Sequence, residues 1–361
     1  MRVSKKIFRP SLLASTLASI WIRLGWVNDQ KYKDNGWDSY AEKVQFKFLK
    51  LQFRLFSRKH MDQLERMVND VRSSRIFSRH CNKLESDQHR PRTCEMTFKH
   101  SGNAGDIIYA LPAIRALSNG HPSKLFLKLD VPINSWSEKE HPLGKSGLTA
   151  EMAKFLQPLL EHQTWLSSIQ LYNDETVDYD LDIFRNVPNI NNVRGGNIAH
   201  WYFWLFAVSA DLSQPWLEIH PLPVARKKIV LARSSRYRNP SINYAFLHAM
   251  GEVDFVGTRS EFIEMQQTLP QLRHVECLDS LHLARVIKSA RFFIGNQSFP
   301  YAIAEAVKVP RILEVCPQCP NVIPTGGNAG EAFFQPNFEK LVRHFWELTC
   351  PDAPVERPNC D

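Results

Sequence analysis

The feature that most constrains the fold is a regular alternation of short apolar segments and longer helical segments, which starts near residue 95. The expected strands are 94–100, 123–130, 167–173, 228–234, 253–258, 275–279, 291–296 and 311–317. The expected helices are 106–119, 147–163, 242–250, 259–269, 280–290 and 298–309. Such alternation indicates βαβ units and parallel sheets. We therefore expect an α/β fold of two facing Rossmann-like, doubly wound domains, with ligands at the carboxyl ends of the strands.

Composition divides the chain into three expected regions. Residues 1–90 form a basic helical extension, 91–222 a first Rossmann-like domain and 223–361 a second one. The polar segment 85–93 and the proline-rich, basic segment 220–228 are the expected linker and hinge. The chain has 361 residues and a net charge of +8, so we expect a surface that attracts phosphates, nucleic acid or an anionic membrane.

The sequence of the N-terminal region allows more than one binding partner. Segment 43–60 alternates basic and large apolar residues, so a helix there either lies on an acidic membrane or nucleic acid or packs with a solvated basic edge. Packing is the commoner fate of such a stripe. The apolar run 11–22 follows a basic start and resembles a signal peptide, but no clear cleavage site follows it. We expect a cytoplasmic protein, with peripheral contact to the inner face of a membrane as an alternative.

The seven cysteines suggest a reducing compartment, because an odd, scattered set is not typical of a disulfide framework. Cys316 and Cys319 form one C-x-x-C pair that could begin a zinc site with Cys350 and Cys360. A single pair is weak support for zinc. We favour a loop with incidental thiols and expect no metal.

Segment 290–315 has the pattern of a buried strand, a polar turn, a helix and a second strand. Its turn is Gly295-Asn296-Gln297-Ser298, and free backbone N–H groups at the following helix N-terminus favour an anion such as phosphate. Ser298 is also the expected N-cap of that helix. Glu305, further along the helix, either accepts hydrogen bonds from ribose hydroxyls or is an ordinary solvated glutamate.

Two further strand-end loops carry candidate ligand contacts. Arg233, Ser234 and Arg236 lie at the carboxyl end of the expected strand 228–234, where arginine side chains suit a diphosphate. The alternative is a basic surface loop. Gly257 and Thr258 lie at the carboxyl end of the expected strand 253–258 and would let the backbone approach a base or a sugar.

The stretch His100-Ser-Gly-Asn-Ala-Gly105-Asp106 has glycines that allow a tight turn. It is neither a P-loop, since no lysine follows Gly105, nor a G-x-G-x-x-G motif. Asp106 would open the next helix, whose N-terminus keeps a carboxylate ionised and ready to take a proton from a hydroxyl. Helix capping alone would also explain this aspartate.

The stretch GNAGDIIYALPAIRAL resembles the first loop of the ADP-heptose:lipopolysaccharide heptosyltransferases, glycosyltransferase family 9. The stretch IGNQSFPYAIAEAVKVPRILEV resembles the nucleotide-sugar turn of the same family, with Asn296-Gln297-Ser298 where Asp-Thr/Ser-Gly is usual. The resemblance implies a B-type glycosyltransferase fold with an inverting, metal-independent reaction. It also implies that Asp106 is the general base.

The segment 178–206 mixes carboxylates, a histidine and aromatic residues and suits an acceptor wall in the first domain. His200 is a second candidate for the base. The alternative is a polar loop followed by a core helix.

Three functions stay open. The first is a glycosyltransferase that moves a sugar from a nucleotide diphosphate to a glycan or lipid-linked hydroxyl, in surface glycan or lipopolysaccharide synthesis, without a cofactor. In this function 91–222 binds the acceptor and 223–361 the nucleotide sugar. The second is a sugar transferase that modifies nucleic acid. The third is a non-catalytic module of the same fold that binds a glycan or a nucleotide.

Overall fold

The computed structural model describes residues 37–56, 58–87, 95–132, 146–186, 195–223 and 228–349. Two compact units share the chain. One joins residues 1–92 to Ile183–Val193, and the other, Thr93–Asp182 with Arg194–Asp361, contains both sheets. The apolar run 11–22 and residues Cys350 and Cys360 lie outside the described residues. Among the helices that are described, none has the length and apolar content to cross a membrane.

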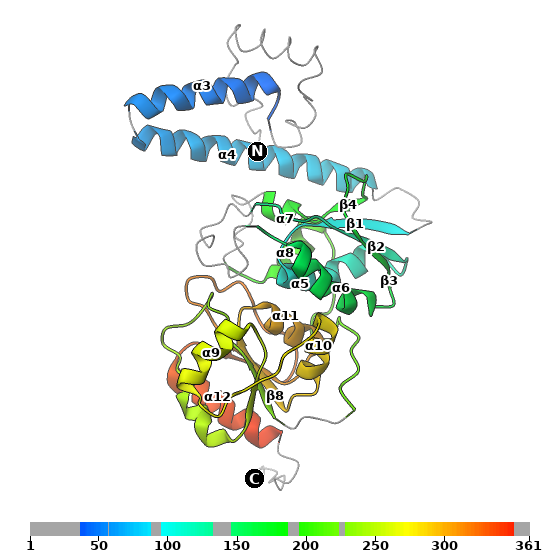
Figure 1. Ribbon diagram of the computed structural model, residues 1–361. Helices are drawn as coiled ribbons and strands as arrows, with labels where there is room; N and C mark the ends of the chain where they lie inside the picture. The colour runs from blue at the N-terminus through cyan, green and yellow to red at the C-terminus, as the bar shows by residue number, and fades with distance from the viewer. Residues whose placement is uncertain are drawn as a thin grey trace, which may run out of the picture. The chain divides into compact units, whose positions relative to one another are not determined.

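The first unit is helical, as expected for the N-terminal extension (Figure 1). Its helices are α3 (Tyr40–Phe56), α4 (Arg58–Asp87) and the short α7 (Ile183–Asn186). Arg75 of α4 binds Glu42 of α3 through Nη1 at 3.0 Å and Asp38 through Nη2 at 3.1 Å. Because Glu42 is buried, this ion pair fixes α3 against α4.

The first sheet is parallel, with the strand order β3-β2-β1-β4. Its strands are β1 (Met96–His100), β2 (Ser123–Leu127), β3 (Leu166–Leu171) and β4 (Tyr179–Asp180). Helices α5 (Ala104–Ser118) and α6 (Ala150–Glu161) make the two crossovers, and α8 (Ile198–Phe206) packs on α5. The three expected strands are confirmed, whereas β4 is only two residues long and carries no strand pattern of its own.

The second sheet is parallel and has the strand order β10-β9-β8-β5-β6-β7. Its strands are β5 (Ile229–Ala232), β6 (Val253–Phe255), β7 (Arg273–His274), β8 (Phe292–Asn296), β9 (Arg311–Glu314) and β10 (Ala329–Ala332). In chain order this is the 3-2-1-4-5-6 arrangement of the Rossmann fold. The expected α/β fold with Rossmann-like sheets is thus confirmed.

Two expected elements of the second sheet differ in the structure. The segment 275–279 is not a strand, because pairing at this edge occurs at β7 and ends with the bond from Val275 N–H to Phe255 O. The segment 242–250 forms only the short 3-10 helix η2 (Ala245–Met250). The Asn243 side chain accepts the Ala245 N–H, which starts the turn late.

The remaining helices are α9 (Arg259–Thr268), α10 (Ser280–Lys288), α11 (Phe299–Val307) and α12 (Gln335–Leu348). A hydrophobic core of fully buried strand residues, including Ile229, Leu231, Phe255, Phe292 and Ile294, supports the second sheet. The strand order reverses between β5 and β8, which is where ligands of open α/β sheets bind. Arg233, Asn296 and Glu314 stand at the carboxyl ends of three neighbouring strands there.

Candidate functional site

The turn between β1 and α5 carries Asp106 in the first turn of the helix. The helix begins at Ala104 with Asn103 as N-cap, so Asp106 is its third residue and not its first. The Asn103 N–H donates to Asp106 Oδ2 at 3.1 Å. Asp106 is half-buried. Its carboxylate therefore helps to cap the helix and remains accessible from solvent.

The first turns of α5 and α11 lie against each other. A Cβ built on Gly105 would lie 3.8 Å from the Cα of Phe299 and 4.0 Å from the Cβ of Ala302. Only a small residue at position 105 permits so close an approach without crowding. Asp106 follows Gly105 in the same first turn of α5.

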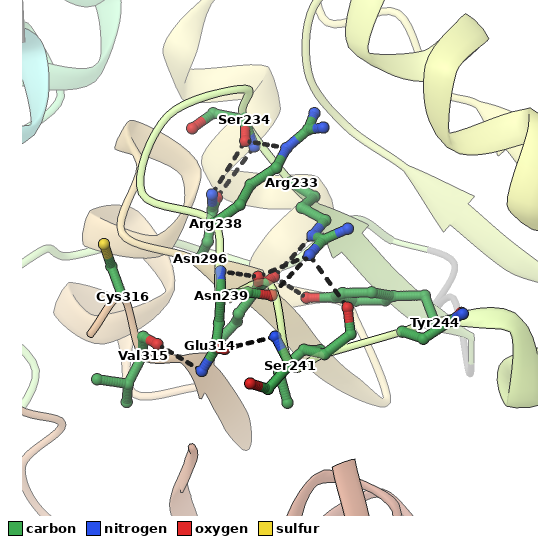
Figure 2. Close-up of polar contacts among 12 residues, drawn as sticks. Arg233, Ser234, Arg238, Asn239, Ser241, Tyr244, Asn296, Glu314, Val315 and Cys316 are labelled. Atoms are coloured by element: carbon green, nitrogen blue, oxygen red, sulfur yellow. Dashed lines mark hydrogen bonds and ion pairs between the residues drawn. The ribbon is translucent and has the colours of Figure 1, made fainter. Parts of the chain in front are cut away.

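Arg233, at the end of β5, is bound inside the protein by Glu314 of β9 (Figure 2). Its Nε donates to Glu314 Oε2 and its Nη2 to Glu314 Oε1, both at 2.8 Å. Burial is the largest influence and opposes the charge of Arg233, but the hydrogen bonds to Glu314 and the nearby charges of Tyr244, Glu314 and Glu264 together raise the pKa of the guanidinium. Both of these Arg233 nitrogens are therefore already bound to a carboxylate, and not presented to a diphosphate.

Glu314 is the centre of this cluster and is fully buried. Besides Arg233, it accepts the Tyr244 hydroxyl at 2.7 Å and the Asn239 N–H at 2.6 Å. Burial and the negative charge of Glu314 raise the pKa of Tyr244 well above its usual value, so the hydroxyl remains a hydrogen-bond donor. Four hydrogen bonds thus satisfy a charge that would otherwise be costly to bury.

Asn296, at the end of β8, holds the loop that follows β5 (Figure 2). Its Oδ1 accepts the Ser234 N–H at 3.0 Å, and its Nδ2 donates to Ser234 O at 3.0 Å and Arg236 O at 2.6 Å. The side chain is fully buried. Asn296 therefore shapes the Ser234–Arg236 loop.

Gln297 holds a different loop, the Cys316–Cys319 turn. Its Oε1 accepts the Cys316 N–H at 3.0 Å, and its Nε2 donates to Cys319 O and Asn321 Oδ1, both at 2.6 Å. Both cysteines are buried thiols outside any disulfide, and no cluster of metal-ligating side chains occurs in the part of the chain that the structure describes.

The N-terminus of α11 differs from those of α6, α8, α9 and α10, whose N-cap side chains each accept a helix N–H. Ser298 occupies the N-cap position as expected, but its Oγ donates to Asn296 O at 3.1 Å and makes no cap hydrogen bond. Pro300 lies in the first turn. The first-turn N–H groups of α11 are thus not satisfied by the cap side chain.

Arg236 lies in the loop that Asn296 holds. Its guanidinium Nε is buried and makes no hydrogen bond to any residue that the structure describes. The guanidinium lies 5.1 Å from the centre of the Tyr237 ring. A buried N–H donor without an acceptor is uncommon, and an anion is a group that could satisfy it.

Thr258 begins α9 at the end of β6. Its hydroxyl accepts the Glu261 N–H at 3.3 Å, and its own N–H donates to Glu261 Oε2 at 3.0 Å, which together form a capping box. Glu261 Oε1 also accepts the Ser235 N–H at 3.3 Å. Gly257, with a positive φ of 154°, precedes this cap. These contacts join the α9 N-terminus to the loop of Ser234 and Arg236.

Glu305 is neither solvated nor open to a ribose, contrary to both expectations for it. The carboxylate is buried and binds Lys308 Nζ at 2.6 Å and Arg311 Nε at 2.5 Å. Thr325 adds its N–H at 3.0 Å and its hydroxyl at 2.8 Å. Glu305 lies one helical turn after Tyr301 and therefore on the same face of α11. Both side chains are buried.

His200 is exposed on α8, where its ring lies 6.1 Å from that of Phe203. The carboxylates expected beside it are bound elsewhere: Asp180 and Asp182 both pair with Lys99, at 2.6 and 3.3 Å. Asp182 also accepts the Ser101 N–H at 2.7 Å. Asp182 therefore supports the loop that leads to Asp106, and the acceptor wall stays a prediction.

Three residues of the site were missed in the sequence: Glu314, Tyr244 and His100. Glu314 ends the short strand Arg-Ile-Leu-Glu, and no local pattern pairs it with Arg233, which lies 81 positions away. His100 is the last residue of β1 and is buried, and its sequence signal was only its place two residues before Gly102.

No protein-family model matches the chain, and no curated protein matches it either. Several solved structures resemble it in backbone arrangement. A glycosyl transferase family 9 structure from Veillonella parvula has a TM-score of 0.45 at 13% identity, over 70% of this chain and 91% of that one. E. coli heptosyltransferase WaaC with ADP-2-deoxy-2-fluoro heptose has a TM-score of 0.43 at 12% identity, over 71% of this chain and 100% of that one.

E. coli ADP-heptose lps heptosyltransferase II has a TM-score of 0.41 at 13% identity, over 70% of this chain and 98% of that one.

Proposed function

We propose that the protein is a glycosyltransferase that moves a sugar from a nucleotide diphosphate to a hydroxyl of a glycan or lipid-linked acceptor. The observation that carries the proposal is the contact between Gly105 and the first turn of α11. In this proposal Asp106, which follows Gly105, takes the proton of the acceptor hydroxyl, and the N-terminus of α11 at the switch point of the second sheet receives the leaving phosphate.

The proposed reaction is a single displacement with inversion. The acceptor oxygen forms a bond to the anomeric carbon as its proton passes to Asp106, and the bond from that carbon to the diphosphate oxygen breaks. The electron pair of the broken bond leaves with the diphosphate. Charge therefore develops at the leaving phosphate, where preorganised N–H donors are most effective.

The leaving diphosphate is assigned to the α11 N-terminus and to Arg236. The helix offers backbone N–H groups and the positive end of its dipole. Arg236 adds a guanidinium with a buried, unpaired Nε. In this proposal Arg233 supports the site indirectly, because its Nε and Nη2 already donate to Glu314. These groups would supply the charge stabilisation that a divalent metal supplies in other transferases, and so we propose a metal-independent reaction.

A ligand-binding screen tests the nucleotide site first. We expect nucleoside diphosphates and nucleotide sugars to raise the melting temperature with EDTA present, whereas nucleosides without phosphate leave it unchanged. Arg236→Met should abolish the shift. Arg238→Met is the matched control, because the Arg238 guanidinium is already bound to Glu264 and should not be needed for phosphate. A protein that none of these nucleotides stabilises would contradict the proposal.

The nucleotide sugar that stabilises the protein is then tested with candidate acceptors. NMR of the product should show the anomeric configuration opposite to that of the nucleotide sugar. Retention of configuration would contradict the single displacement, and loss of transfer in EDTA would contradict metal independence.

A further inference from the structure

The loop between β1 and Asp106 is bound by side chains at three successive backbone N–H groups. Ser101 N–H donates to Asp182 Oδ1 at 2.7 Å, and Gly102 N–H donates to His100 Nδ1 at 2.8 Å. Asn103 N–H donates to Asp106 Oδ2 at 3.1 Å. Each N–H has a specific acceptor, so the conformation of the loop and the position of the Asp106 carboxylate are set together.

His100 is the member of this loop whose chemistry is most demanding. A backbone N–H can only donate, so His100 Nδ1 must be the unprotonated acceptor of the Gly102 bond. The ring is neutral in that state, and its proton is on Nε2, which lies 2.8 Å from the Tyr202 hydroxyl. His100 and Tyr202 are both buried. The imidazole therefore links the β1–α5 turn to α8 in one tautomer.

Gly102 shows how closely the ring and the carboxylate are packed. A Cβ added at Gly102 would lie 2.5 Å from His100 Cε1 and 3.1 Å from Asp106 Oδ2. A side chain at this position would thus collide with both groups at once. The space beside Gly102 is filled by the imidazole on one side and by the carboxylate on the other.

We infer that His100, held by Tyr202, is a positioning residue that fixes the Asp106 carboxylate through the Gly102 N–H. This inference rests on the proposed function only in that Asp106 is the base whose position matters. His100 does not exchange protons with the acceptor, because both of its ring nitrogens have partners within the protein.

Two substitutions test the roles of the two ring nitrogens separately. In His100→Asn, the side-chain oxygen can accept the N–H two residues later, as asparagine does in an Asx turn, but it cannot reach Tyr202. In His100→Gln, the longer amide can reach the Tyr202 hydroxyl and does not replace the Nδ1 acceptor. We expect His100→Asn to keep the protection of the Gly102 amide against hydrogen–deuterium exchange, and His100→Gln to lose it.

The kinetic readout is a split between kcat and KM in the transfer reaction. We expect His100→Gln to lower kcat about 10- to 100-fold with an unchanged KM for the nucleotide sugar, and His100→Asn to stay within about threefold of the wild type. If the role of His100 were purely structural, the kcat of both variants would instead fall in proportion to the loss in their melting temperatures. Equal kcat values for the two variants would overturn the inference.

Two measurements make the result independent of the transfer reaction. In the wild type, 15N NMR of the His100 ring should show an unprotonated Nδ1 and a protonated Nε2, and the opposite tautomer would overturn the inference. Tyr202→Phe removes one hydroxyl from a protein that should still fold, and it should partly deprotect the Gly102 amide. If Asp106→Asn leaves transfer intact, the proposed function fails, while the Gly102 exchange data still decide whether His100 holds the loop.

Discussion

The two strand–turn–helix connections of the site use their polar residues in opposite ways. Before α5, the backbone N–H groups are bound by side chains, and the carboxylate of Asp106 stays half-exposed. Before α11, the side chains of Asn296 and Gln297 are buried in neighbouring loops, and the cap side chain leaves the helix N–H groups to other partners. The first connection thus presents a side chain, and the second presents its backbone.

This difference indicates which groups can react and which can only support. In the α5 connection a substitution at Asp106 should affect chemistry, whereas in the α11 connection substitutions of the polar side chains should affect stability first.

Glu314→Gln should give the largest loss of stability. It leaves the buried Arg233 guanidinium without a compensating charge, which we expect to lower the free energy of unfolding by about 3–5 kcal/mol in urea denaturation. Glu264→Gln is the control. It removes the half-exposed partner of Arg238 and should cost less than about 1 kcal/mol. Similar losses in the two variants would show that the cluster at Glu314 is not a buried ion pair.

Gly102→Ala should be the next most damaging substitution. Its Cβ would approach His100 Cε1 to 2.5 Å, and the displacement of the ring should cost about 1–3 kcal/mol. Gly105→Ala places its Cβ no closer than 3.8 Å to its neighbours and stands within the helix α5. It should be neutral or slightly stabilising in thermal denaturation. The opposite ranking would contradict the packing described for this turn.

Asn296→Asp tests whether the α11 connection depends on its buried amide. An aspartate cannot donate to Ser234 O and Arg236 O, so two carbonyl groups lose their donor, at a cost of about 1–3 kcal/mol. Asn243→Asp is the matched control, because Asn243 uses its side-chain oxygen to accept the Ala245 N–H and an aspartate can do the same. Equal stability of the two variants would argue against the supporting role of Asn296.

Lys308, at the C-terminal end of α11, should give the smallest effect. Burial lowers its pKa to about 8 from 10.5, although Glu305 counteracts this shift. Between these values the unfolded chain binds a proton that the folded protein does not, so stability should rise with pH. We expect a gain of about 1 kcal/mol from pH 8 to pH 9 in the wild type, and no such gain in Lys308→Met. If the stability of the wild type relative to Lys308→Met fell between pH 8 and pH 9, the lowered pKa of Lys308 would be contradicted.

The sequence was informative where the signal is local. The strand–helix alternation predicted both Rossmann-like sheets, and the glycines around Asp106 predicted a tight turn before a helix. It was not informative where partners are distant. Arg233 was predicted to bind a diphosphate because strand-end arginines are common in such sites, and no local pattern indicated that Glu314, 81 positions away, binds its Nε and Nη2.

Glu305 shows the same limit on a shorter scale. Its place on α11 was predicted, but nothing in the helical pattern indicates that Lys308 and Arg311 fold over the carboxylate and bury it. Burial of an ion pair depends on the sum of tertiary contacts, which a local pattern does not contain.

The transfer rate of Asp106→Asn is the most direct test of the central claim. With the nucleotide sugar and acceptor that the wild type uses, the loss of the base should lower kcat by about 10²- to 10⁴-fold while nucleotide binding is retained. His200→Gln, which alters the exposed histidine of α8, should transfer at the wild-type rate. A wild-type rate for Asp106→Asn, or a large loss for His200→Gln alone, would contradict the assignment of Asp106 as the base.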